Sequence, residues 1–165
     1  MSKFRFRLQP LLDRLLDKKE EAAKALVDRR KELAAEQKLL EDLKQRERDL
    51  VAKRQDLRRR VLEPQAGETL TGGSIQQRRQ YVDALGSDIE STRDSIFSQR
   101  LAVEEAQEKV NQAQAYLLKC QRDLEVLDKY RERLEQRFKR EAERKEELEL
   151  DEVGNMIFTS RRRNS

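Results

Sequence analysis

The sequence predicts an all-α protein in which two long helices fold back on each other as an antiparallel coiled-coil hairpin. Of its 165 residues, 42% are charged and 36% are hydrophobic, whereas globular domains have about 25% and about 45–50%. Two stretches place apolar residues at alternating spacings of three and four, and a short glycine-containing break separates them. These features favour one hairpin over residues 1–165 and argue against a compact globular core.

Composition also excludes several classes of function. The chain has no histidine, one cysteine and five glycines, which argues against His-based catalysis, an internal disulfide and phosphate-binding loops. We therefore expect no enzyme, no catalytic residue, no cofactor and no metal. Low hydrophobicity is typical of disordered chains, but here the net charge is only +4 and strong helix formers dominate. No run approaches the ~18 apolar residues of a membrane span, so we expect a cytoplasmic protein that does not span a membrane.

The first helix is expected at about residues 9–62. Pro10 suits a first helical turn. A stripe of alternating three- and four-residue spacing runs from Leu12 to Val61, and ten of its fifteen positions are apolar. The charged residues within this stripe make it the weaker of the two.

The break at residues 63–74 contains Pro64, which opposes a continuing helix, and the permissive pair Gly72-Gly73. Ser74 is the expected N-cap of the second helix. A break this short favours an antiparallel hairpin over the alternative, a single bent helix in a parallel dimer.

The second helix is expected at about residues 74–151. Its stripe runs from Ile75 to Phe138 without a change of phase, and fifteen of nineteen positions are apolar. Gly154 is the expected helix stop, which leaves residues 152–165 as a tail. If the chain folds back near Glu68, Leu12 faces Leu124, and the second helix overhangs the first by about four turns.

Both termini carry apolar residues with more than one interpretation. Phe4, Phe6 and Leu8 alternate with arginines, so they could cover the second helix, form a docking surface or anchor at a membrane interface. A charge run such as 141–152 is usually a solvated face, yet the apolar run 156–158 that follows has no stripe to join and indicates a contact site.

Three internal features have structural interpretations. The basic runs 58–60 and 161–163 could suggest nucleic acid, but the balanced charge and the lack of a reading motif argue against it. Cys120 lies on the stripe and is expected to be a small core residue. Gly86 interrupts the second helix at a cost of ~1 kcal/mol relative to alanine, and marks a close approach, a bend or an unselected cost.

The opening run Phe4–Asp13, followed by Lys18, Glu20, Glu21 and Ala22, resembles the start of the flagellar FliJ family. Chain length, two-helix periodicity and the spacing of Tyr81, Leu85 and Ile89 are also similar. Pro10 departs from the expected pattern. The family shares its architecture with the stalk proteins of virulence type III secretion.

This resemblance implies a stalk component of the flagellar protein export apparatus, a rod that inserts into the hexameric export ATPase. It also implies contacts with the membrane export gate and with substrate chaperones, and a location peripheral to the inner membrane. The expected ATPase contacts are Phe4, Arg5, Phe6, Leu8, Leu12, Phe138, Met156, Ile157 and Phe158. The expected gate contacts are Leu40, Lys44, Tyr81, Asp83 and Leu85.

Other functions remain open at this point. The chain could be a generic coiled-coil scaffold or dimeric spacer, or a stalk protein of virulence-type rather than flagellar secretion. A prefoldin-type holdase is disfavoured because residues 63–74 are too short and glycine-rich to supply strands.

Overall fold

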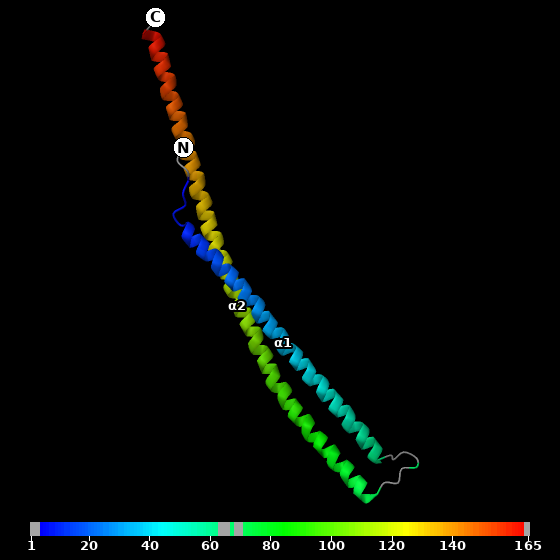
Figure 1. The fold of residues 1–165 in the computed structure, drawn as a ribbon. Coiled ribbons are helices and arrows are strands. Elements are labelled where there is room, and N and C mark those ends of the chain that lie inside the picture. Colours follow the sequence, from blue (N-terminus) through cyan, green and yellow to red (C-terminus); the bar gives the residue numbers. More distant parts are fainter. Residues whose placement is uncertain (1–3, 63–66, 68–70, 164–165) are drawn as a thin grey trace. The chain divides into compact units, whose positions relative to one another are not determined.

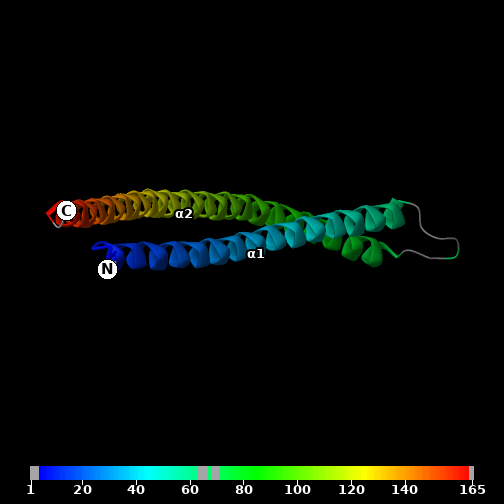
Figure 2. The same cartoon turned by 90° about the horizontal axis from the view of Figure 1, so that it is seen from above.

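The computed structural model describes residues 4–62, 67 and 71–163, and over these residues the chain is a helical hairpin without strands. Helix α1 spans Gln9–Leu62 and helix α2 spans Gly72–Arg163. Two compact units divide the chain: a terminal unit (Met1–Ala23 with Tyr116–Ser165) and a loop unit (Lys24–Ala115). Parts of both helices lie side by side in each unit (Figures 1 and 2). The predicted fold class is confirmed.

The apolar stripes form the seam between the helices. All nineteen positions of the α2 stripe, from Ile75 to Phe138, are buried or half-buried. Fourteen of the fifteen α1 positions are also covered, and Arg29 is the exposed one. Burial of both stripes supplies the hydrophobic free energy that holds α1 and α2 together within each unit.

Contacts within the loop unit show that the helices run antiparallel. The Gln99 amide donates to the Glu36 carboxylate and to the Glu36 carbonyl, the latter at 3.1 Å. Farther along α1 and closer to the start of α2, Arg93 Nε donates to Glu47 Oε1 at 2.6 Å. As the α1 residue number rises, the α2 partner number therefore falls, as an antiparallel pair requires.

Gly86 makes room for a charged residue of the α1 seam. A Cβ atom at Gly86 would lie 2.9 Å from Nη2 of Arg54, which is closer than a normal contact. Arg54 is half-buried at this point, and its Nε atom is covered by the surrounding protein. Of the three interpretations of this glycine, the structure supports a close approach between the helices.

The start of α2 differs from the prediction. Helix α2 begins at Gly72, so Ser74 lies inside the first turn and is not the N-cap. Thr71 occupies that position: its Oγ1 accepts from the Ser74 N–H at 3.4 Å, and its carbonyl accepts from the Ile75 N–H at 3.1 Å. Threonine is a preferred N-cap because its hydroxyl satisfies a free helical N–H. Pro64, expected to end the first helix, lies outside the described residues.

The predicted end of the second helix, at about residue 151 before a 152–165 tail, is wrong. Helix α2 continues to Arg163 and passes through Gly154. A glycine stop requires a left-handed backbone conformation, and among the described residues only Gly67, with φ of 100°, has positive φ. The hydroxyl of Thr159 donates to the Asn155 carbonyl at 2.6 Å, within the turn that follows Gly154. The ~1 kcal/mol cost of an internal glycine is therefore not enough to end this helix.

Truncation of a seam leucine should destabilise the loop unit. Leu85 is 3% exposed, so Leu85→Ala should lower the free energy of unfolding by about 2 kcal/mol or more, through lost burial and a cavity. Leu101, 52% exposed in the same unit, provides the matched control, and Leu101→Ala should change stability by less than about 0.5 kcal/mol. Urea unfolding followed by circular dichroism measures both, and equal losses would contradict the seam assignment.

The contact between Gly86 and Arg54 predicts a coupled pair of substitutions. In an Arg54→Ala background, Gly86→Ala should raise the free energy of unfolding by about 1 kcal/mol, because alanine is the better helix former. In the wild-type chain the gain should be smaller, since the new methyl group must displace the guanidinium group. A double-mutant cycle of unfolding free energies measures this difference, and a gain that is equal in both backgrounds would exclude the contact.

Candidate functional site

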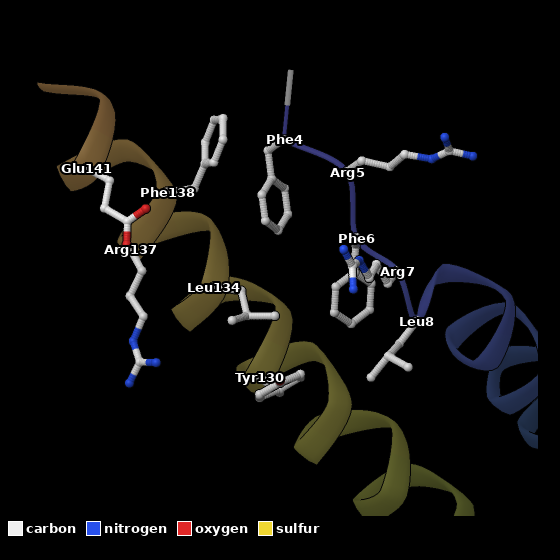
Figure 3. Close-up of a pocket in the computed structure, with 10 residues that line it drawn as sticks. All are labelled: Phe4, Arg5, Phe6, Arg7, Leu8, Tyr130, Leu134, Arg137, Phe138 and Glu141. Carbon is white, nitrogen blue, oxygen red and sulfur yellow. The ribbon is translucent and has the colours of Figure 1, made fainter. Parts of the chain in front are cut away.

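The non-helical segment 4–8 lies against α2 in the terminal unit (Figure 3). Phe4 and Phe138 have ring centroids 5.7 Å apart, and Phe6 and Tyr130 have theirs 6.4 Å apart, both in tilted arrangements. Such pairs contribute about 0.5–1.5 kcal/mol each beyond their buried area. The aromatic residues of the N-terminus therefore fasten this segment to α2.

A pocket of about 540 Å³ lies between this segment and α2. Tyr130 and Leu134 of α2 belong to its lining. Arg5 and Arg137 also line it, and their side chains point away from each other (Figure 3). The guanidinium groups of Arg5 and Arg137 therefore do not face a common point within this pocket.

The predicted ATPase contacts fall into two groups with different exposure. Phe6 and Leu12 are buried, while Phe4 and Phe138 are half-buried against each other. These four residues support the terminal unit from inside. The other five predicted contacts are accessible to a partner: Arg5, Leu8, Met156, Ile157 and Phe158.

The last part of α2 has no covering helix within the terminal unit. Residues 142–162 are all exposed, and the pocket lining reaches no farther along α2 than Glu141. In Figure 1 this part of α2 continues past the N-terminal segment. We call residues 142–163 the overhang; at 1.5 Å per residue it is ~33 Å long, about six turns instead of the predicted four, because α2 does not stop at Gly154.

The structure does not bring the two predicted ATPase regions together. Phe138, which holds the N-terminal segment, and Met156 lie on the same helix eighteen residues apart, a separation of ~27 Å along its axis. The sequence interpretation missed Leu148, Leu150 and Val153, which are exposed on the overhang. Leu148 and Leu150 interrupt the acidic run 141–152 and Val153 follows it directly, so their apolar character in the sequence could have revealed them.

The predicted gate contacts lie in the loop unit and are also divided. Leu40 and Lys44 are half-buried on α1, and Leu85 is buried in the seam, where it cannot touch a partner directly. Tyr81 is 45% exposed, and its ring lies beneath Lys53 with Nζ 5.4 Å from the centroid. Since Lys53 is nine residues beyond Lys44, ~13 Å along α1, the α1 and α2 members of this set do not form one cluster.

Asp83, the fifth predicted gate residue, lines a pocket of about 420 Å³ near the loop. We call it the loop-end pocket. Its two arginines come from different helices, Arg58 from α1 and Arg79 from α2. In the sequence Arg58 stands out only as part of the basic triplet 58–60, because the alignment of α1 with α2 that brings Arg79 beside it depends on the fold. The full lining is Arg58, Val61, Leu62, Arg79, Val82 and Asp83.

Shifted pKa values occur away from these surfaces. Hydrogen bonds from Lys109 and Lys129 hold the pKa of Glu105 and Glu125, respectively, below its ordinary value. A side-chain hydrogen bond with Cys120 raises the pKa of Tyr116. The two carboxylate shifts arise from neighbours four residues apart on one helix face, a spacing that supports helix formation and does not indicate acid–base chemistry. In the described part of α1 and α2, no stretch is long and apolar enough to cross a bilayer.

Comparison with known proteins identifies the family to which this helical hairpin belongs. No curated protein sequence is detectably similar to the chain. A solved structure from Chlamydia trachomatis, described as a YscO homolog, is similar with a TM-score of 0.81 over 99% of this chain and 100% of that chain. At 21% sequence identity, that similarity concerns the fold. The model of the YscO-like protein family matches residues 3–164. Because this match covers nearly the whole sequence, the chain belongs to the YscO-like family of type III secretion stalk proteins.

Proposed function

We propose that this protein is the cytoplasmic stalk component of a virulence-type III secretion system. In this proposal the overhang enters the hexameric export ATPase, and the loop unit contacts the membrane export gate and substrate chaperones. The protein is a mechanical component with no catalytic residue of its own. It lies at the inner membrane through its partners, without spanning the bilayer.

One observation carries the ATPase assignment: the overhang has no covering helix in the terminal unit and exposes apolar side chains. Leu150, Met156 and Phe158 are each more than 60% exposed. Exposed apolar groups gathered on one element are typical of protein contact sites. A helix that enters an asymmetric ring can favour one nucleotide state over another only through different affinities for those states, and such affinities require contact surface of this kind.

A flagellar stalk protein is the second candidate. The N-terminal run Phe4–Asp13 resembles the FliJ family and favours it, whereas the YscO-like match favours the virulence-type system. Binding to purified ATPases from the two kinds of system distinguishes them. A generic scaffold or dimeric spacer would bind neither.

Truncation after Glu141 should abolish stimulation of the export ATPase. This variant keeps the aromatic pairs of the terminal unit, which end at Phe138, and the described residues that it removes have no covering helix. ATP hydrolysis and hexamer formation are measured with the full chain and the truncated chain. Undiminished stimulation by the truncated chain, with helicity reduced only by the missing residues, would overturn the ATPase assignment.

Charge reversal on the loop unit should weaken binding to the export gate. We expect Lys44→Glu and Asp83→Lys each to raise the Kd for the soluble domain of the gate protein by about fivefold, because charges at protein interfaces act through complementarity. Lys38, an exposed lysine on the same helix, provides the matched control, and Lys38→Glu should leave Kd unchanged. Calorimetry measures the three values. Equal effects at Lys38 and Lys44 would indicate only a general charge effect and remove the specific contact.

A further inference from the structure

The overhang carries an apolar stripe on a different face of α2 from the seam. Continued beyond Phe138, the seam spacing falls on Glu141, Lys145, Leu148, Glu152, Asn155 and Thr159, so only one position in six is apolar. Leu150, Val153 and Ile157 follow a new stripe with spacings of three and four. At about 100° per residue, these three lie within about 60° of one another and about 160° from the continued seam.

This new face is open within the terminal unit. Leu150 is 71% exposed, Val153 52% and Ile157 50%. Three apolar residues at spacings of three and four give a helix one narrow docking face. Met156 and Phe158 flank this face on its two sides, at about 60° from Val153 and about 80° from Leu150, respectively, whereas Leu148 lies on the opposite side.

The charge on the same side indicates the chemistry of the partner. Residues 141–152 contain seven acids and two bases, a net charge of −5. Glu143, Glu146 and Glu147 precede the stripe on its own side of the helix, and none of these described carboxylates forms an ion pair. Glu143 and Glu147 are four residues apart, a spacing at which like charges destabilise a helix. A partner with basic side chains at this end would relieve that repulsion.

We propose that the Leu150–Val153–Ile157 face binds an apolar groove of the export ATPase, with lysine or arginine side chains of the groove facing Glu143–Glu147. The proposal rests on the proposed function and specifies which side of the overhang makes the contact. The seam stripe, which holds the two helices together, and the new stripe, which holds the partner, then occupy opposite sides of one helix. Of the apolar run 156–158, Ile157 lies at the centre of the contact, and Met156 and Phe158 flank it on either side.

The matched pair Leu150→Asp and Leu148→Asp tests this assignment. These two leucines are two residues apart, are both exposed and lie on opposite faces, so neither substitution should alter folding. Binding of the full-length variants to purified export ATPase is measured by calorimetry. Leu150→Asp and Ile157→Asp should each weaken binding about tenfold, and Leu148→Asp less than twofold. The combined charge reversal Glu143→Lys, Glu146→Lys and Glu147→Lys should also weaken binding about tenfold.

Several results would overturn the proposal. Loss of binding in Leu148→Asp equal to that in Leu150→Asp would exclude a one-sided contact. Unchanged binding by the triple charge reversal would exclude a basic groove. If Leu150→Asp disrupts a dimer of the free protein in sedimentation and leaves ATPase binding intact, the face joins two copies instead. Truncation after Glu141 distinguishes failure of the proposed face from failure of the proposed function. If the truncation abolishes binding to the ATPase and the point variants do not, only the assignment of the face is wrong. If the truncation leaves binding unchanged, the proposed function fails as well.

Discussion

Burial of one narrow apolar seam is the constraint on which this structure depends. With 42% of its residues charged, the chain has too few apolar residues to build a larger core than this seam where the two helices pack together. Every α2 stripe position from Ile75 to Phe138 is covered, and most of the remaining helix surface is exposed. Long helices in water take most of their stability from such packing rather than from intrinsic propensity. The fold is therefore specified by the phase of the stripes.

That constraint explains what the sequence could and could not reveal. Periodicity identified both helices, because a stripe held in phase from Ile75 to Phe138 has one simple structural solution. It could not locate the end of α2, since Gly154 is compatible with either a stop or a continuing helix. It also could not separate buried from accessible site residues: Phe6 and Leu85 are apolar residues near predicted contacts, but both are covered by the opposite helix or segment. The loop-end pocket depends on how Arg58 and Arg79 align across the two helices, and local sequence does not contain that information.

Covered residues hold the fold together, and exposed residues make the proposed contacts with partners. In the terminal unit, aromatic pairs hold the N-terminal segment on α2, and the overhang beyond it is open to a partner. In the loop unit, charged and polar residues lie within the α1 seam, where Glu36 meets Gln99 and Glu47 meets Arg93. The proposed stalk function depends on the same division, because a stalk protein acts through contacts made by its exposed side chains.

The close approach of the Arg54 side chain to Gly86 affects how the paired helices respond to force. A slip of one heptad in either direction would move Arg54 from the glycine to the level of Arg93 or Arg79, because these residues lie seven positions on either side of Gly86. Both shifted arrangements place two guanidinium groups close together beside the seam, and one of them also leaves Glu47 opposite Gly86 without an arginine. Sliding of one helix along the other is thus opposed electrostatically in both directions. A push or twist applied to the loop unit would be transmitted by a pair of helices that keep their alignment.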